Sequence, residues 1–343
     1  MSLIAGNALL RVGVIGVGAI GKEHVKRVNY LAGAQVTAVF DVNTAQVRDW
    51  LATENIEAEV FENGIDLINS NMVDAVVVAS WGPTHEEFVL ASIKAGKYVF
   101  CEKPLAVTEE GCRRIIEAEI AGGKRLVQVG FMRRYDKSYR QLKAVLDKKI
   151  IGEPLTLNAW HHAPEAPGFK GDMAITDSFV HEADVLRWLL DEDYVSAQVI
   201  LPRKTQISSE PELQDPHVML LRTKSGVHIS VQSFVFCQYG YDIQCQITGE
   251  KGVAALPDPA TTVIRTNATL QKEIFVDWKD RFFDAFDTEF QEWIDDVRSN
   301  KLSGPTAWDG YCVSVTTEAC VKAKYSGGIE PIELPPKPAF YNK

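Results

Sequence analysis

A glycine-rich turn, Gly16-Val17-Gly18-Ala19-Ile20-Gly21, constrains the fold of this chain more than any other feature. It follows an apolar run that ends at Ile15, and Asp41 lies about twenty residues further on, at the end of a second apolar run. In this spacing the first glycine allows a tight turn, the second lets the backbone approach a pyrophosphate, and the third lets the helix pack on the strand. The pattern predicts a strand, turn and helix that bind a dinucleotide; the alternative is a glycine-rich turn in an ordinary α/β domain.

The residue type at position 41 bears on which dinucleotide would bind. A carboxylate at Asp41 can accept hydrogen bonds from both hydroxyls of the adenosine ribose, and it would repel a 2′-phosphate. The sequence therefore favours NAD over NADP as the cofactor. The cofactor-binding residues expected from the turn and the acid are Gly16, Gly18, Ala19, Ile20, Gly21 and Asp41.

Length and charge limit the function classes that suit this chain. Its 343 residues are long for one core and suggest two domains. The formal net charge of −10, without a basic stripe, argues against nucleic acid as a partner and favours a neutral ligand. The sequence has no run of about 18 apolar residues that could span a membrane, and its start lacks the pattern of a signal peptide. The six cysteines form no C-x-x-C pair, so we expect buried free thiols and a cytoplasmic protein.

The first 130 residues alternate strand and helix signals, which predicts a doubly wound parallel sheet. Two of the helices between the strands have clear ends: one begins at Thr84 and stops at Gly96, and another begins at Thr108 and stops at Gly122-Gly123. The strands are expected at residues 10–15, 36–41, near 60, 75–80, 98–101 and 126–129.

The pattern changes after about residue 150, where strand-like segments follow each other with short connections. Turn residues at 223–226 and 249–252 predict hairpins, and hence a C-terminal α+β domain with a large open antiparallel sheet. We expect the domains to be residues 1–130 and 131–343, and the uncovered face of the open sheet to require a partner copy. The strands are expected at 155–160, 195–201, 218–223, 227–236 and 241–248, and the helices near 179–190, 285–298 and 310–325.

Two further segments lie where ligands of parallel sheets bind, beyond the carboxyl ends of the strands. The first runs from Ser80 to His85 after the fourth strand, and the second is Glu102-Lys103-Pro104 after the fifth. A lysine at position 103 can reach the nicotinamide end of a bound dinucleotide and hydrogen-bond a substrate hydroxyl. The alternative is a surface lysine before a proline that fixes the turn.

An acid and a histidine at helical spacing, Asp177 and His181, form a candidate catalytic pair. At the start of a helix an i, i+4 pair lies on one face, where the carboxylate can orient the imidazole and stabilise its protonated form. Such a pair suits alcohol oxidation, in which a base takes the hydroxyl proton while hydride leaves the same carbon. The alternative is an aspartate that caps the helix, with a histidine packed behind it. The histidines show no pattern of metal ligands, and we expect no bound metal ion.

A third group of polar residues is expected to line a ligand pocket. Arginine, histidine and tyrosine provide the directional hydrogen bonds that a polyhydroxylated ligand requires, although each is more often structural or exposed. The group comprises the run from Gly130 to Tyr135, the pair His161-His162, and the run Tyr239-Gly240-Tyr241.

Taken together, these segments resemble the family of glucose–fructose oxidoreductase and inositol dehydrogenase (GFO/IDH/MocA). The resemblance covers nearly the whole chain, and the runs at 131–136, 239–245 and 304–311 are similar to the bacterial inositol 2-dehydrogenases within it. The residues that carry it are the glycine turn, Glu102-Lys103-Pro104, Gly130-Phe131-Met132-Arg133-Arg134-Tyr135-Asp136, Asp177-x-x-x-His181-Glu182, Tyr239-Gly240-Tyr241-Asp242-Ile243-Gln244-Cys245 and Gly304-Pro305-Thr306-Ala307-Trp308-Asp309-Gly310-Tyr311.

The resemblance implies a Rossmann domain joined to a domain with an open antiparallel sheet, through which such chains usually form tetramers. It implies NAD-dependent oxidation of myo-inositol to the 2-keto inosose in inositol catabolism, with Lys103, Asp177 and His181 as the catalytic residues. The cofactor-binding residues would extend to Ser80, His85, Glu102 and Lys103, and the substrate-binding residues would be Arg133, His161, Asp177, His181 and Tyr241. A related sugar dehydrogenase and a non-catalytic dinucleotide-binding regulator remain as alternatives.

The chain departs from the family pattern at one place. Inositol dehydrogenases tend to have His-Arg-Asn-Pro where this chain has His161-His162-Ala163-Pro164, so an amide that could bind a ring hydroxyl is absent. A missing hydrogen bond to a hydroxyl can relax or redirect specificity. The preferred substrate therefore stays open among myo-inositol, scyllo-inositol and an aldopyranose, while the reaction class is unaffected.

Overall fold

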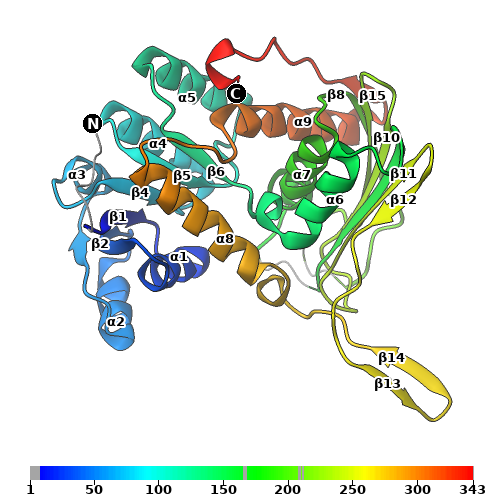
Figure 1. The fold of residues 1–343 in the computed structure, drawn as a ribbon, viewed down its shortest axis with the longest axis horizontal. Helices are drawn as coiled ribbons and strands as arrows, with labels where there is room; N and C mark the ends of the chain where they lie inside the picture. The colour runs from blue at the N-terminus through cyan, green and yellow to red at the C-terminus, as the bar shows by residue number, and fades with distance from the viewer. Residues whose placement is uncertain (1–7, 165–167, 208–209, 211, 343) are drawn as a thin grey trace. The chain divides into compact units, whose positions relative to one another are not determined.

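The computed structural model describes residues 8–164, 168–207, 210 and 212–342, which fall into two compact units (Figure 1). The first unit contains Met1–Phe131, Phe286–Ser314 and Pro336–Lys343, and the second contains Met132–Ala285 and Val315–Pro335. The chain therefore returns to its first unit twice, unlike the expected division into residues 1–130 and 131–343. An amphipathic helix carries no sign of which unit its apolar face will join, so the sequence alone does not predict this return.

The first unit is built on a six-stranded sheet in the order β3-β2-β1-β4-β5-β6, with every neighbouring pair parallel. This order is that of the doubly wound dinucleotide-binding fold, and the prediction for this part of the chain is confirmed. The strands are β1 (Leu10–Ile15), β2 (Ala34–Phe40), β3 (Glu59–Phe61), β4 (Ala75–Val78), β5 (Tyr98–Glu102) and β6 (Val127–Gly130). The helices between them are α1 (Ala19–Tyr30), α2 (Thr44–Glu54), α3 (Gly64–Asn69), α4 (His85–Lys94) and α5 (Glu109–Gly122).

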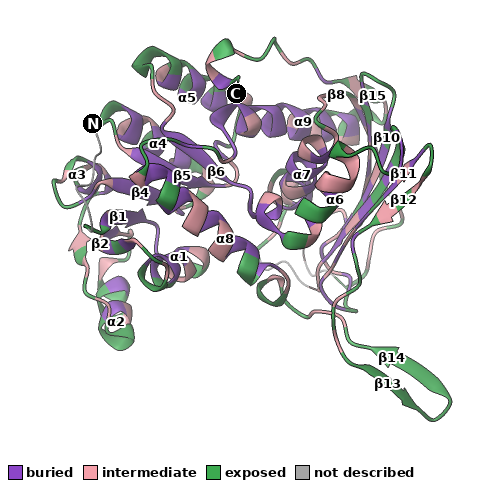
Figure 2. Ribbon diagram, viewed as in Figure 1, coloured by how far each residue is buried: buried purple, intermediate pink, exposed green. Residues whose placement is uncertain are grey.

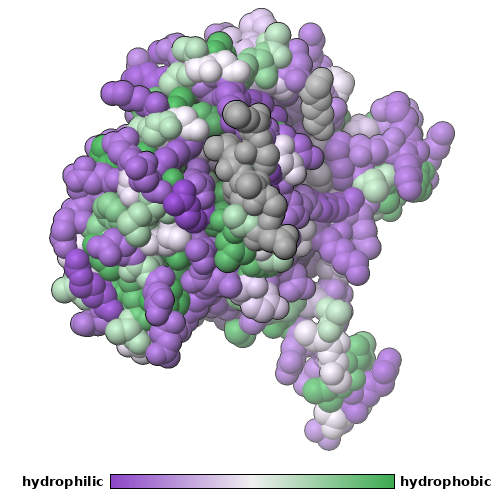
Figure 3. All heavy atoms as spheres, turned by 60° about the vertical axis from the view of Figure 1, so that its left-hand side comes forward, coloured by the Kyte–Doolittle hydropathy of each residue, from purple (hydrophilic) through white to green (hydrophobic). Residues whose placement is uncertain are grey.

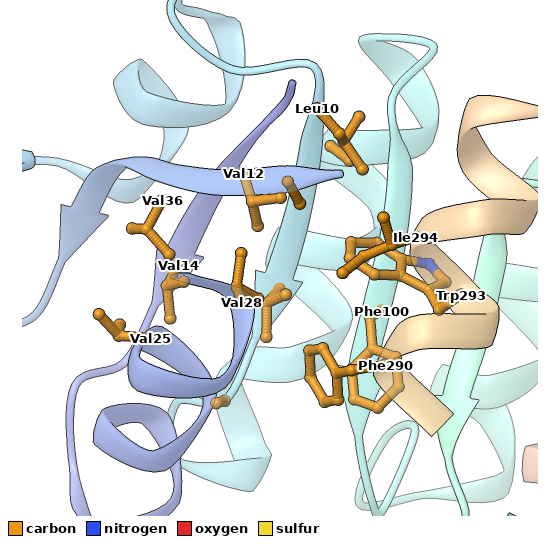
Figure 4. Close-up of a cluster of buried hydrophobic side chains, with 14 of the residues drawn as sticks. Leu10, Val12, Val14, Val25, Val28, Val36, Phe100, Phe290, Trp293 and Ile294 are labelled. Atoms are coloured by element: carbon orange, nitrogen blue, oxygen red, sulfur yellow. The ribbon is translucent and has the colours of Figure 1, made fainter. Parts of the chain in front are cut away.

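Local signals set the ends of these helices, and an apolar core joins them to the sheet. The Thr108 hydroxyl accepts a hydrogen bond from the Gly111 N–H at 3.1 Å, and Gly123 ends α5 in the left-handed conformation. The central strands are buried on both faces, which explains their near-continuous valine runs. Phe290, Trp293 and Ile294 of α8 (Trp278–Arg298) pack into this core beside Phe100 of β5 (Figure 4).

The last described residues also belong to the first unit. The Glu119 carboxylate of α5 is fully buried, and its Oε1 accepts the backbone N–H groups of Leu126 and Val127. The hydroxyl of Tyr341 donates a hydrogen bond to Glu119 Oε2 at 2.6 Å, so both oxygens of this carboxylate accept hydrogen bonds. The C-terminal segment thus completes the surroundings of a buried charge that lies more than two hundred residues earlier in the chain.

The second unit contains a seven-stranded sheet in the order β12-β11-β7-β10-β9-β8-β15. It is the predicted open sheet, with one correction: β7 and β10 pair parallel, whereas the other neighbours are antiparallel. The connection after β7 runs through helix α7, and a long connection of this kind permits parallel pairing. The strands are β7 (Pro154–His162), β8 (Tyr194–Ile200), β9 (His217–Thr223), β10 (His228–Phe234), β11 (Asp242–Gly249), β12 (Gly252–Ala255) and β15 (Ile329–Pro331).

Helices α6 (Lys137–Asp147) and α7 (Val180–Leu190) lie on one side of this sheet (Figure 1). The residues that face them, such as Leu157, Val231 and Ile247, are buried, while most alternate residues on the opposite face are intermediate or exposed. Figure 2 shows this mixture of burial classes along the strands. A hairpin of β13 (Val263–Thr266) and β14 (Thr269–Lys272) projects from the unit with every residue exposed. Both predicted turns are confirmed, but α6, β12, β15 and this hairpin were not predicted.

Two predicted helices begin earlier than expected: α8 at Trp278 rather than at residue 285, and α9 (Ala307–Ser326) at Ala307 rather than at residue 310. The six cysteines are free and buried, as predicted. Within the described residues, no helix is both long and apolar enough to cross a membrane.

Candidate active site

The three glycines of the first turn have different surroundings, and these explain their spacing. Gly16 has a φ of +88°, and a Cβ added there would lie 2.4 Å from the backbone of Ser80. A Cβ on Gly21 would lie 1.9 Å from the Gly16 carbonyl oxygen, whereas one on Gly18 would meet no described atom within 4 Å. Gly16 and Gly21 are thus required for packing within the protein, and Gly18 borders open space that a ligand can enter.

The turn leads directly into the N-terminus of α1. Gly18 precedes the first helical residue, and no side chain among the described residues caps this end, which leaves its N–H groups suited to an anion. The Asp41 carboxylate accepts hydrogen bonds from the N–H groups of Val17, at 2.8 Å, and Asn43, at 2.9 Å. It therefore holds the glycine turn as well as having lone pairs available for a ribose, a double role that its position in the sequence does not reveal. Open space at Gly18, an uncapped helix and a fixed carboxylate fit a dinucleotide.

Two alanine substitutions separate the packing role from the binding role. Gly18→Ala is expected to leave the melting temperature unchanged and to weaken NAD⁺ binding, because the added methyl group enters only the open space. Gly21→Ala is expected to lower the melting temperature, because its methyl group collides with the Gly16 carbonyl. Thermal unfolding and NADH fluorescence titration of both variants check this pair; equal NADH affinity in Gly18→Ala and the native chain would contradict the assignment.

The loops after β4 and β5 are joined by His85, which was predicted to be a cofactor-binding residue. Its Nδ1 lies 2.7 Å from the carbonyl oxygen of Pro104, and its Nε2 lies 2.9 Å from that of Ser80. The side chain is only 1% exposed, so it fixes the two loops from within. Glu102 is also buried and lies 2.7 Å from His24, while Lys103 precedes Pro104 through a cis peptide bond.

The second unit gathers most of the predicted pocket residues around a buried ion pair. Arg133 is 1% exposed and pairs with Glu182, which is also 1% exposed, through Nη1 and Oε1. His161 contacts both members of this pair: its Nδ1 lies 3.2 Å from Arg133 Nη2 and 3.1 Å from Glu182 Oε2. The Ser178 hydroxyl lies 3.3 Å from the same nitrogen. The cluster fixes an arginine, a histidine and a serine in one polar network.

Electrostatics within this cluster keep both members of the pair charged. Burial by itself would raise the pKa of Glu182, but the charge of Arg133 and the hydrogen bonds from His161 and Arg133 outweigh it and lower the pKa to about 2. For Arg133, burial acts to lower the pKa, yet the charge and hydrogen bond of Glu182, together with smaller contributions from Tyr139 and Tyr241, raise it overall. Burial raises the pKa of Tyr241 to about 12, so this phenol stays protonated and can donate a hydrogen bond.

His181 lies next to this cluster, and Asp177 lies on the turn before it. The His161 ring centroid is 6.3 Å from that of His181 and 6.0 Å from that of Tyr241. Asp177 belongs to a π-helical turn, Ala174–Ser178, and His181 to the first turn of α7, so the pair spans the join of two helical geometries rather than one regular helix. The second unit thus brings together Arg133, His161, His181 and Tyr241; Lys103 belongs to the first unit.

Sequence reasoning missed Glu182 as a member of the site, although it directly follows His181 in the motif. Its role depends on a partner 49 residues earlier, Arg133, and only the folded chain shows that the two meet. Ser178 was missed for the same reason. In the part of the chain that the structure describes, no group of three or more His, Cys, Asp or Glu side chains could hold a metal ion.

The fold and this site define a class of protein. Residues 10–131 match the model of the oxidoreductase family with an NAD-binding Rossmann fold, and residues 139–255 match that of the GFO/IDH/MocA C-terminal domain. The chain therefore belongs to the GFO/IDH/MocA family of NAD-binding oxidoreductases.

Individual relatives are similar over nearly their whole length. The chain is 55% identical to the inositol 2-dehydrogenase of Serratia proteamaculans over 336 residues, which cover 97% of this chain and 99% of the relative. It is 56% identical to that of Azotobacter vinelandii, over 97% of this chain and 98% of the relative. Its structure resembles the crystal structure of the Lactobacillus casei myo-inositol dehydrogenase in complex with NAD(H) and myo-inositol, with a TM-score of 0.95 and 39% identity, covering 97% of this chain and all of the other.

Proposed function

We propose that this chain is an NAD-dependent inositol 2-dehydrogenase of the cytoplasm that acts in inositol catabolism. It would oxidise myo-inositol to 2-keto-myo-inositol, with transfer of one hydride to NAD⁺ and release of one proton. The observation that carries this proposal is the full-length similarity to the Lactobacillus casei enzyme, whose structure holds NAD(H) and myo-inositol. The polar cluster around Arg133 supports it, because a polyhydroxylated ring needs fixed hydrogen-bonding groups.

The residues expected to hold the cofactor are those of the first unit. Gly16, Gly18, Ala19, Ile20 and Gly21 would surround the pyrophosphate, Asp41 would bind the adenosine ribose, and the segment around Ser80, His85, Glu102 and Lys103 would border the nicotinamide. When bound, the nicotinamide supplies the acceptor for the hydride.

The remaining chemistry belongs to side chains of this chain. His181 would take the proton of the reacting hydroxyl, and Asp177 would orient the imidazole and bind a neighbouring hydroxyl. Lys103 would donate a hydrogen bond to the reacting oxygen. Arg133, His161 and Tyr241 would hold the other ring hydroxyls, since Arg133 and His161 are already fixed by Glu182.

A double substitution tests the role given to Asp41. Asp41→Ser with Val42→Arg removes the carboxylate that would repel a 2′-phosphate and adds a positive charge at a position that is 95% exposed. We expect the ratio of kcat/KM for NADP⁺ to that for NAD⁺ to rise. The two cofactors are compared in the native chain and the variant, and an unchanged ratio would contradict the role of Asp41.

The identity of the substrate is tested with a small panel. NAD⁺ reduction is followed by absorbance with myo-inositol, scyllo-inositol and D-glucose at equal concentrations. Ala163 favours a second candidate, a scyllo-inositol or aldopyranose dehydrogenase, because this position lacks an amide near His161. Preference for myo-inositol supports the proposal, preference for another substrate supports the second candidate, and NAD binding without reduction would instead indicate a regulator.

We further propose that the chain is a homo-oligomer, a tetramer as the family resemblance implies, in which a second copy covers the open sheet. The face opposite α6 and α7 carries Trp160, Val218 and Leu220 only partly covered. The β13–β14 hairpin projects from the unit, with hydrophobic residues on its surface (Figure 3). Its Ile264 and Leu270 are exposed, and an isolated two-stranded hairpin is marginally stable in water. Light scattering coupled to size exclusion measures the mass; a monomer at micromolar concentration would contradict this proposal.

A further inference from the structure

The first unit contains a chain of polar side chains that leads from α8 through His24 to Glu102, and the proposed function gives no role to His24. His24 of α1 is fully buried, and its Nε2 lies 2.7 Å from Oε1 of Glu102 at the end of β5. Its other nitrogen, Nδ1, lies 3.1 Å from Nη1 of Arg27, whose Nε donates to Asp287 of α8 at 2.7 Å. Burying polar groups is costly unless each is paired, and a buried network in which they are paired holds its members rigidly. We therefore asked what this network holds in place.

The partners of His24 fix its protonation state. A guanidinium nitrogen can only donate, so Nδ1 must accept the hydrogen bond from Arg27. The proton of a neutral ring then lies on Nε2, which donates to Glu102. Burial, above all, lowers the pKa of His24, which agrees with a neutral ring. Arg27 itself is held by Asp287 and by the faces of the Phe286 and Phe290 rings, 5.1 and 5.9 Å from its guanidinium carbon.

The far end of this chain of contacts is the backbone of Lys103. Oε1 of Glu102 is occupied by His24, and Oε2 accepts the Lys103 N–H at 3.2 Å. For Glu102, burial raises the pKa, but the contacts with His24 together with the charge and the backbone N–H of Lys103 outweigh it and lower the pKa overall, so the carboxylate stays ionised. The other titratable and charged groups that face this pair are Glu23, Arg27, Cys101, Lys103 and, through Arg27, Asp287.

We propose that His24 is a positioning residue for Lys103. In its neutral Nε2–H form, set by Arg27, it holds Oε1 of Glu102 and so orients the carboxylate whose Oε2 accepts the backbone N–H of the catalytic lysine. This inference rests on the proposed function, in which Lys103 hydrogen-bonds the reacting oxygen. Displacement of a catalytic group by about 1 Å can reduce the rate by about two orders of magnitude.

Two amide substitutions of His24 separate its two contacts. The amide nitrogen of glutamine overlays Nε2 and can still donate to Glu102, whereas the amide of asparagine overlays Nδ1, accepts from Arg27 and does not reach Glu102. We expect His24→Asn to lower kcat by about 10- to 100-fold with little change in NADH affinity, and His24→Gln to restore most of this loss. Native kcat in His24→Asn, or an equal loss in both variants, would overturn the proposal.

The pH profile provides a readout that a purely structural role would not move. Without the donor from His24, the pKa of Glu102 rises because a main contribution that offsets burial is lost, and only the contributions of Lys103 remain. The acid limb of kcat/KM should therefore move to higher pH in His24→Asn but not in His24→Gln. Tyr341→Phe is the matched control, since it removes one donor from another buried carboxylate, Glu119. It should lower the melting temperature and leave kcat and the profile unchanged; a similar loss of kcat there would overturn the proposal.

The tautomer can be measured without any substrate. In protein labelled with ¹⁵N-histidine, the His24 signal is identified by its absence in His24→Asn. We expect the neutral Nε2–H form between about pH 6 and pH 8. A proton on Nδ1, or on both nitrogens, would overturn the inference whatever the enzyme oxidises. If the native chain reduces NAD⁺ with no member of the substrate panel, the proposed function is wrong, and this outcome is independent of the tautomer of His24.

Discussion

Glu182→Gln is expected to lower the free energy of unfolding by about 3–5 kcal/mol, because it leaves the charge of Arg133 buried without its carboxylate. Both side chains are 1% exposed, so water cannot replace the lost partner. The substitution keeps the size of residue 182 and one hydrogen-bonding oxygen, which isolates the effect of the charge. Urea unfolding at neutral pH measures the difference. The control is Glu62→Gln, which removes an exposed partner of Arg48 and should cost less than about 1 kcal/mol.

The same pair gives stability a defined dependence on pH. The pKa of Glu182 is lowered from 4.5 to about 2 in the folded chain, so its contribution is complete above about pH 4.5 and is lost as the pH falls toward 2. The shift corresponds to about 3 kcal/mol. Native protein should therefore lose more stability between pH 5 and pH 3 than Glu182→Gln, when both are unfolded with urea at each pH. Parallel losses would show that Arg133 does not hold this carboxylate ionised.

His181→Ala is expected to lower kcat by about 10²–10⁴-fold at neutral pH, since it removes the proposed general base. NADH affinity should change little, because the cofactor-binding residues belong to the other unit. Steady-state kinetics with the preferred substrate and NADH fluorescence titration separate the two effects. Turnover equal to that of the native chain would refute the assignment of the base to His181.

A second histidine of the same unit serves as the control for this variant. His217 lies on β9, is fully buried, and has a pKa lowered to about 4, chiefly by burial. His217→Asn also removes a buried imidazole, but one that lies outside the Arg133 cluster. It should lower the melting temperature while kcat stays near the native value. A large loss of kcat in His217→Asn would mean that the effect of His181→Ala reflects damage to the fold.

The parts of this molecule that sequence reasoning predicted well are those set by local rules. The turn from Gly16 to Gly21 and the caps of α5 at Thr108 and Gly123 depend on neighbouring residues. The fold class and the parallel sheet followed from the alternation of strand and helix signals. The alternation of apolar residues likewise located the main strands of the second sheet. The family resemblance put Arg133, His161 and Tyr241 forward as pocket residues, and their role in binding a substrate stays a prediction.

What the sequence did not reveal depends on pairs that are distant along the chain. Glu182 has no local signature, and its partner Arg133 lies on a different element. The pairing of His24 with Glu102 joins residues 78 positions apart. Asp177 is spaced for a regular helix, but the backbone forms a π-helical turn there, a choice set by packing that spacing alone does not encode.

The two returns of the chain to its first unit matter for how this protein is made. A ribosome releases residues in order, and the nucleotide-binding half would seem to be the first domain able to fold. Yet its core includes Trp293, and Oε2 of the buried Glu119 carboxylate gains the hydrogen bond from Tyr341 only when that residue has emerged. The half that is synthesised first is therefore finished last. A chain cut a few residues short at its C-terminus would carry its defect at the opposite end of the sequence, in the unit that binds the cofactor.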